Sequence, residues 1–229
     1  MRRFIPLALA VALCACSKST EQSSAPPPTQ PEPKDPAPAA APDNRKVLAV
    51  FGDSISAGFG LEPGQSFPDD LQKKLDALSY TWHVVNLGIS GDTTEGGVER
   101  MDSAVSLKPK IVLLELGGND GLRGLPLAVT RKNLETMVET FQNAGARVVL
   151  AGMTLPPNYG PDYIRGFEKI YKDLAAKYRL TFIPFLLSDI VTSDLRYIQR
   201  DGIHPTAEGA EIVSGTVFRA VKPLLDQAR

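Results

Sequence analysis

The sequence predicts an α/β fold, a three-layer α/β/α sandwich built on about five parallel strands. Short apolar runs alternate along the chain with longer segments in which apolar residues recur every three or four positions. The first run ends at a glycine, and an apolar run bounded by a turn signal is typical of a strand buried in a parallel sheet. Strands that alternate with helices imply right-handed crossovers and helices on both sheet faces. The expected strands are residues 47–51, 83–87, 111–116, 148–152 and 181–184.

Helices are expected between these strands and after the last one. Ser66 and Asp69 have the spacing of a capping box, which marks a helix N-terminus. Gly145 is expected to end a later helix, and Thr206 is expected to cap the last. The expected apolar faces, in chain order, are Phe67, Leu71, Leu75 and Leu78; Val98, Met101 and Val105; Leu127, Leu134, Val138 and Phe141; Ile164, Phe167, Tyr171, Leu174 and Tyr178; and Ile212, Val213, Val217 and Val221.

Residues 1–16 have the pattern of an export signal. Arg2 and Arg3 precede an apolar run that is shorter than the roughly 20 residues of a bilayer span, and small residues follow it. The segment Leu13-Cys14-Ala15-Cys16 resembles a bacterial lipobox, in which Cys16 would carry the lipid and become the mature N-terminus. The alternative is an ordinary cleaved signal whose cysteines have no role.

Residues 17–44 are rich in proline and alanine and have no apolar periodicity, which predicts a disordered, partly extended spacer. Such a spacer would join a lipid anchor to a folded domain of residues 45–229, which is long enough for one core. This organisation predicts an exported, periplasmic lipoprotein, anchored in the outer membrane rather than the inner. Because no cysteine follows Cys16, the domain holds no disulfide.

The composition argues against several classes of function. The formal net charge is −1, and no cluster of Lys and Arg resembles a nucleic-acid footprint. The chain has 2 histidines and no cysteine in the domain, so a zinc ligand set is lacking, and we expect no metal and no cofactor. His83 lies in an expected strand and is expected to be structural. We expect a monomer.

Ser54 follows the first expected strand closely. Ligands of open α/β sheets bind beyond the carboxyl ends of the strands, which is where Ser54 would lie. Serine is a weak nucleophile until a base takes its proton, and the second histidine, His204, stands three positions after Asp201. Alone, Ser54 would be interpreted as a turn serine that caps a helix. Together with Asp201 and His204 it favours a hydrolase with Ser54 as nucleophile.

Two loops that follow other expected strands carry suitable donors for a developing negative charge. Glycine lets a backbone N–H approach a ligand closely, and asparagine supplies a side-chain NH₂. Gly91 and Asn119 therefore suit an oxyanion hole completed by the N–H of Ser54. Taken singly, both are ordinary turn residues.

Four ordered segments together resemble the signature blocks of the SGNH, or GDSL-type, hydrolases: Gly52-Asp53-Ser54, Gly91, Gly117-Gly118-Asn119-Asp120, and Asp201-Gly202-Ile203-His204-Pro205. Their neighbouring residues are most similar to the bacterial multifunctional acyl-CoA thioesterase/lysophospholipase/arylesterase group. The resemblance covers the domain and implies a flavodoxin-like sandwich. It also implies Ser54 as nucleophile, His204 as base, Asp201 as its orienting acid, and Gly91 and Asn119 in the oxyanion hole. Ile55 stands where the family motif has leucine, a residue of similar size.

The expected function is hydrolysis of carboxylic esters or thioesters of acyl chains, with a small-molecule substrate and an acyl-enzyme intermediate. A carbohydrate esterase that removes acetyl groups is the alternative within enzymes. A non-catalytic envelope lipoprotein that keeps the site by descent is the alternative outside them. The candidate substrate-binding residues are Leu122, Leu125, Leu155, Pro156 and Tyr159.

Overall fold

The computed structural model describes residues 43–192 and 194–228, so the expected export signal, Cys16 and nearly all of the expected spacer lie outside the described residues. In the described part, five parallel strands form one sheet in the order β2-β1-β3-β4-β5. All five expected strands are confirmed, each to within one residue at either end. They are β1 (Lys46–Gly52), β2 (Trp82–Asn86), β3 (Ile111–Glu115), β4 (Arg147–Ala151) and β5 (Thr181–Ile183).

β1 lies inside the sheet, and the direction of the strand order reverses there. Val50 is paired with Asn86 of β2 on one side and with Leu113 of β3 on the other. In a doubly wound sheet of this order, the loops after β1 and β3 leave toward opposite faces and open a crevice between them. The fold therefore places the ends of β1 and β3 beside a ligand-binding position.

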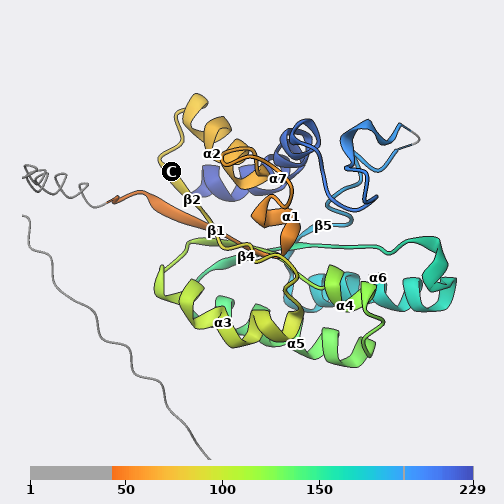
Figure 1. Cartoon of the computed structure of the whole chain (residues 1–229). Helices are drawn as coiled ribbons and strands as arrows, with labels where there is room; N and C mark the ends of the chain where they lie inside the picture. The colour runs from red at the N-terminus through yellow and green to blue at the C-terminus, as the bar shows by residue number, and fades with distance from the viewer. Residues whose placement is uncertain (1–42, 193, 229) are drawn as a thin grey trace, which may run out of the picture. The chain divides into compact units, whose positions relative to one another are not determined.

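Helices cover both faces of the sheet (Figure 1). The long helices α2 (Phe67–Ala77) and α7 (Ala207–Gln227) lie on one face, and α3 (Thr94–Ser106), α5 (Leu127–Asn143) and α6 (Pro161–Tyr178) lie on the other. None of the helices in residues 43–192 and 194–228 combines the length and the apolar character needed to cross a membrane. The short elements are α1 (Ser54–Ala57), α4 (Gly118–Leu122), η1 (Pro157–Tyr159) and η2 (Leu195–Tyr197).

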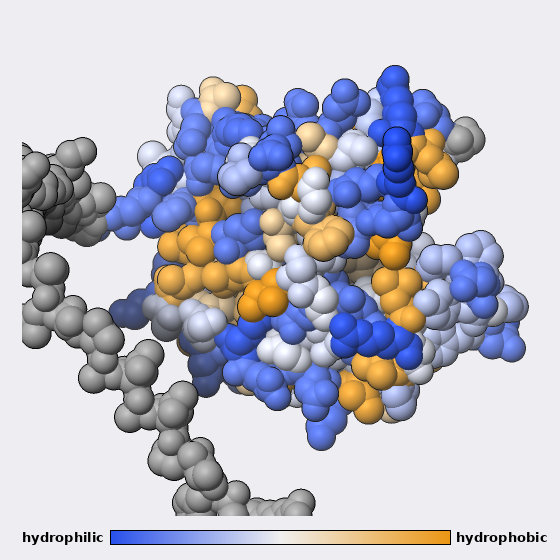
Figure 2. Space-filling model, viewed as in Figure 1, coloured by the Kyte–Doolittle hydropathy of each residue, from blue (hydrophilic) through white to orange (hydrophobic). Residues whose placement is uncertain are grey.

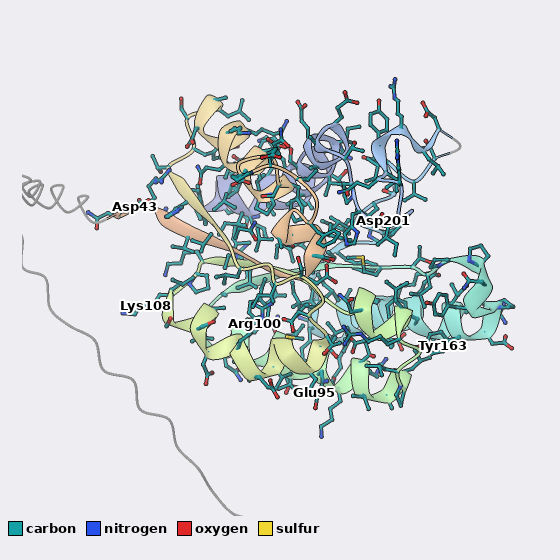
Figure 3. All side chains as sticks on the ribbon, viewed as in Figure 1. Asp43, Glu95, Arg100, Lys108, Tyr163 and Asp201 are labelled. Atoms are coloured by element: carbon teal, nitrogen blue, oxygen red, sulfur yellow. The ribbon has the colours of Figure 1, made fainter. Side chains whose placement is uncertain are left out.

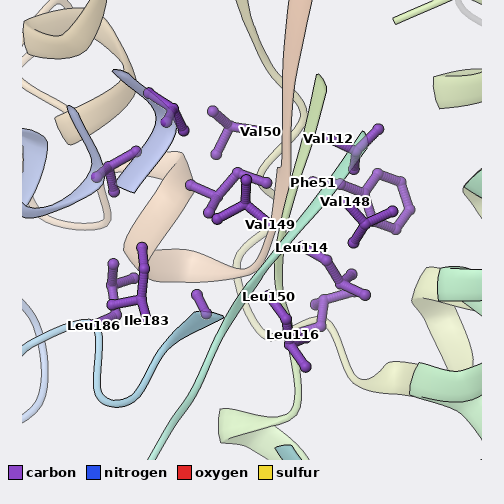
Figure 4. Close-up of a cluster of buried hydrophobic side chains, with 14 of the residues drawn as sticks. Val50, Phe51, Val112, Leu114, Leu116, Val148, Val149, Leu150, Ile183 and Leu186 are labelled. Atoms are coloured by element: carbon purple, nitrogen blue, oxygen red, sulfur yellow. The ribbon is translucent and has the colours of Figure 1, made fainter. Parts of the chain in front are cut away.

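The core lies on both sides of the strands, because consecutive strand residues point to opposite faces. Val50 and Phe51 point to opposite sides of the sheet in Figure 4, and both are fully buried. The Phe51 ring packs edge-on against Phe141 of α5, with 5.3 Å between the ring centres. These apolar strands hold the polar ends of β1 and β3 in fixed positions.

The helix signals in the sequence are confirmed with one exception. The capping box at α2 is present, since the Ser66 hydroxyl accepts from the Asp69 N–H and the Asp69 carboxylate accepts from the Ser66 N–H. Thr206 caps α7, and Gly145 follows α5 with a left-handed φ of +85°. Leu78 was expected on the buried face of α2, but its side chain is 48% exposed. The helix ends one residue earlier, so Leu78 leaves the helical repeat.

Candidate active site

Ser54 is the first residue of α1, directly beyond the end of β1. The carboxylate of Asp53 accepts from the Ile55 N–H at 3.1 Å and so caps this short helix. Gly58 ends the helix with a left-handed φ of +77°, a conformation that glycine adopts without strain. Ser54 is only 9% exposed. The sharp strand-to-helix turn thus presents a largely buried hydroxyl at the carboxyl edge of the sheet.

The structure brings Ser54, His204 and Asp201 together. The Nε2 atom of His204 lies 2.8 Å from the Ser54 Oγ, and its Nδ1 lies 2.6 Å from Oδ2 of Asp201. The other oxygen of Asp201 accepts from the backbone N–H groups of Ile203 at 2.9 Å and His204 at 3.0 Å. Figure 3 shows Asp201 beside α1, at the end of the sheet away from Asp43.

The charge on Asp201 fixes the form of the histidine. Burial would raise the pKa of Asp201, but the hydrogen bonds from the backbone and ring of His204 and from the Ile203 N–H lower it overall. An ionised Asp201 accepts a hydrogen bond from Nδ1–H of His204, which keeps the proton on Nδ1 and leaves Nε2 free to take the serine proton. The Phe59 ring lies 4.6 Å from the His204 ring and supports it from one side.

Asn119 and Gly91 lie at the same cavity as Ser54 and His204. This cavity has a volume of about 280 Å³, and Asp53, Phe59, Gly118 and Leu122 are also among its lining residues. Asn119 is in α4, and its Nδ2 donates to Oδ2 of Asp53 at 3.2 Å. Gly91 has a left-handed φ of +82°. The geometry gathers a hydroxyl, an imidazole and candidate N–H donors around one space.

Two arginines hold the loop that carries Gly91. Arg100 of α3 donates to the carboxylate of Asp92 at 2.7 Å, to the Leu87 carbonyl at 2.8 Å and to the Gly52 carbonyl at 2.9 Å. Arg123 donates to the Gly91 carbonyl at 2.8 Å. The position of Gly91 is therefore tied to the ends of both β1 and β2.

A buried pair of carboxyl groups lies beneath the nucleophile. Glu115, the last residue of β3, is fully buried, and its Oε2 accepts from the Ser56 hydroxyl at 2.5 Å and the Asp53 N–H at 3.2 Å. Burial, reinforced by the nearby charge of Asp53, raises the pKa of Glu115 well above its usual range. Burial also raises the pKa of Asp53, to about 6, although the hydrogen bond from the Ile55 N–H opposes the rise.

A sequence model described as the GDSL-like lipase/acylhydrolase family matches residues 50–212. The chain belongs to this family. The predicted family and the prediction of an ester hydrolase are thereby confirmed, as is the three-layer α/β fold.

Named relatives of this GDSL hydrolase are esterases and thioesterases. It is 42% identical to esterase TesA of Pseudomonas aeruginosa over 181 residues, which cover 79% of this chain and 90% of the relative. It is 38% identical to an arylesterase of Vibrio mimicus, over 74% of this chain and 85% of the relative. It is 33% identical to thioesterase 1/protease 1/lysophospholipase L1 of Escherichia coli K12, over 82% of this chain and 88% of the relative. The crystal structure of TesA superposes with a TM-score of 0.75, at 42% identity, over 78% of this chain and 99% of that one.

A second, more apolar cavity of the GDSL hydrolase adjoins the first. It has a volume of about 320 Å³ and shares Ile55, Gly118, Leu122 and Ile203 with the cavity at Ser54. Of the expected substrate-binding residues, Leu122, Leu155 and Pro156 line it, whereas Leu125 and Tyr159 line neither cavity. The Tyr159 hydroxyl instead donates to the Leu122 carbonyl at 2.7 Å, and that of Tyr163 donates to the Leu125 carbonyl at 2.8 Å.

Sequence reasoning did not assign roles to Asp53, Glu115, Arg100 and Phe59. A signal existed for Glu115, since a carboxylate that ends an apolar strand is unusual unless it has partners. The contacts of Arg100 and Phe59 join distant segments and leave no local pattern. The other histidine, His83, pairs with Asp43 at 2.9 Å. Among the described residues, no group of three or more His, Cys, Asp or Glu side chains could hold a metal ion.

Proposed function

We propose that this GDSL hydrolase cleaves carboxylic esters and thioesters of acyl chains through an acyl-enzyme formed on Ser54. One observation carries the proposal: the Ser54 hydroxyl, 2.8 Å from the His204 ring, opens into the cavity that Gly91 and Asn119 line. Nucleophile, base and N–H donors within reach of one reacting carbon are what acyl transfer requires.

The mechanism begins when His204 Nε2 takes the Ser54 proton as Oγ attacks the carbonyl carbon. The carbonyl oxygen becomes negative and is stabilised by the N–H groups of Ser54 and Gly91 and the Nδ2 of Asn119. The tetrahedral intermediate collapses, and the alcohol or thiol leaves with the proton from His204. A water molecule then gives a proton to His204 and attacks the acyl-enzyme. The second tetrahedral intermediate collapses, and His204 returns the proton to the Ser54 Oγ as the acid is released. Asp201 stabilises the imidazolium in both halves.

The apolar cavity supports an acyl chain longer than acetyl. Leu155, Pro156 and Leu187 line it beyond the shared residues Ile55 and Leu122, so a chain attached at Ser54 has a continuous apolar path. Burial of each CH₂ group contributes about 0.8 kcal/mol, which rewards chains that extend along this path. An acetyl group would leave the cavity unused, so the structure offers no support for acetyl specificity.

The test measures hydrolysis of p-nitrophenyl butyrate by Ser54→Ala and His204→Ala variants. We expect each variant to lose about 10³-fold or more in kcat. His83→Ala replaces the other histidine and serves as the matched control, which keeps the wild-type rate. Near wild-type turnover by Ser54→Ala would refute the proposal. A series of p-nitrophenyl esters from acetyl to palmitoyl, an acyl-CoA and a lysophospholipid would then define the substrate class, and turnover of acetyl esters alone would favour the carbohydrate esterase.

We also propose that the domain is tethered to the outer membrane on its periplasmic side through a lipid on Cys16, and that it acts as a monomer. The lipobox-like segment and the proline-rich residues after it support the anchor. Cys16→Ser should abolish incorporation of labelled palmitate and move the protein from the membrane fraction to the soluble periplasmic fraction. Cys14→Ser is the control that keeps the label. Light scattering of the domain tests the monomer.

A further inference from the structure

Asp53 lies between the nucleophile and Asn119, and it is 2% exposed. One carboxylate oxygen accepts from the Ile55 N–H at 3.1 Å, and the other accepts from Nδ2 of Asn119 at 3.2 Å. A single buried side chain therefore contacts both the helix that begins with Ser54 and the amide assigned to the oxyanion hole. The mechanism above gives Asp53 no role.

The carboxamide of an asparagine can adopt two orientations that exchange its oxygen and its NH₂ group. A carboxylate accepts hydrogen bonds and donates none, so it selects the orientation that points the NH₂ group toward itself. The NH₂ group carries two hydrogens, and only one is used by Asp53. The second remains available to a substrate oxygen in the cavity that Asn119 lines.

We propose that Asp53 is a positioning residue, whose ionised carboxylate holds the Asn119 carboxamide with its NH₂ group directed toward the oxyanion. The inference rests on the proposed function, because it assigns Asp53 an effect only through the Asn119 donor. A neutral side chain at position 53 that could itself donate a hydrogen bond would favour the opposite orientation and withdraw this donor.

Glu115 supports this role by leaving a single negative charge at the site. Its Oε2 accepts two hydrogen bonds, whereas Oε1 is the only buried side-chain nitrogen or oxygen without a hydrogen-bond partner in residues 43–192 and 194–228. Two ionised carboxylates this deeply buried would repel each other, so the pair favours a neutral Glu115 beside an ionised Asp53. Burial raises the pKa of Asp53, but the hydrogen bonds from the Ile55 N–H and from Asn119 oppose this rise and favour the ionised form.

The experiment is a double-mutant cycle of Asp53→Asn and Asn119→Ala, measured as kcat and KM on p-nitrophenyl butyrate. Asparagine at position 53 still caps α1 but offers an NH₂ group to Asn119. We expect about a 10²-fold loss of kcat in each single variant, with KM changed by less than about threefold. The double variant should be no slower than Asn119→Ala alone, because the donor that Asp53 orients is already absent.

Asp53→Ser provides a second variant, since serine also caps the helix but is too short to reach Asn119. We expect Asp53→Ser to lower kcat in the wild-type background and to cause no further loss in the Asn119→Ala background. Thermal unfolding checks that each variant is folded. Multiplicative losses in the double variant, or wild-type kcat in a folded Asp53→Asn, would overturn the inference. That result differs from failure of the proposed function, in which Ser54→Ala itself would remain active.

Discussion

The guanidinium of Arg100 lies over the Phe51 ring, with its central carbon 3.9 Å from the ring centre. Phe51 is a core residue of β1, and the same guanidinium donates to the Gly52 carbonyl that follows it and to the carboxylate of Asp92. Figure 3 shows Arg100 on the α3 side of the sheet. One planar cation thus connects the core, the end of β1 and the loop of Gly91.

We predict that Arg100→Lys lowers kcat on p-nitrophenyl butyrate by about 10- to 100-fold. A lysine carries one point charge and cannot reproduce three hydrogen bonds and the stacked contact, so the Gly91 loop shifts. Arg131→Lys is the matched control, because Arg131 contacts Asp173 between α5 and α6, in neither cavity. Equal kcat values for the two variants would show that Arg100 does not position the loop.

We predict that Gly52→Ala destabilises the domain by about 1–3 kcal/mol. A β-carbon at this position would lie 2.2 Å from the Ser56 Oγ and 2.3 Å from Oε2 of Glu115, so both side chains must move. Gly215→Ala is the control for which we expect the opposite change in stability. Gly215 lies within α7, and a β-carbon added there would lie 3.8 Å from the nearest side-chain atom, which belongs to Arg219. There alanine should stabilise the helix by about 0.5–1 kcal/mol. Urea unfolding measures both.

Replacing Glu115 should change how stability depends on pH. Its pKa is raised in the folded state, so below the ordinary value of 4.5 both states are protonated and its contribution is fully present. As pH rises, the unfolded chain loses this proton and the folded chain keeps it, which lowers stability by at most about 1.4 kcal/mol per pH unit. Glu115→Gln cannot titrate, so the stability of this variant relative to wild type should increase from pH 4.5 to 7. A constant difference in urea unfolding across that range would contradict the assignment.

We expect Val191→Trp to shift the preferred acyl chain toward shorter esters. Val191 lines the apolar cavity and is 48% exposed, so a larger side chain can fill the opening without crowding the core. The ratio of kcat/KM for p-nitrophenyl octanoate to that for the acetate should fall about tenfold or more. Val129→Trp, at a similarly exposed position in α5, should leave the ratio unchanged. An unchanged ratio for Val191→Trp would place the acyl chain elsewhere.

The sequence was sufficient to predict where the strands lie along the chain, but not every contact at the site. Strands such as β1 and β3 were predictable because apolar runs ending at glycines are local patterns. Ser54 and His204 could be paired because the chain has only 2 histidines and His204 stands three positions after Asp201. Arg100 could not be found in this way, since its partners lie on three segments that only the fold brings together. The prediction that Leu78 is buried was wrong because α2 ends at Ala77, and the apolar spacing does not show which residue ends the helix.

Ser54 and His204 are 150 positions apart in the chain. During synthesis the serine emerges early, and the imidazole follows only when most of the domain has been made. Until then the hydroxyl has no base to take its proton, and a serine without a base is a poor nucleophile. In the proposed mechanism, hydrolytic activity can therefore begin only after most of the domain has been made, because a shorter nascent polypeptide has the nucleophile without its base.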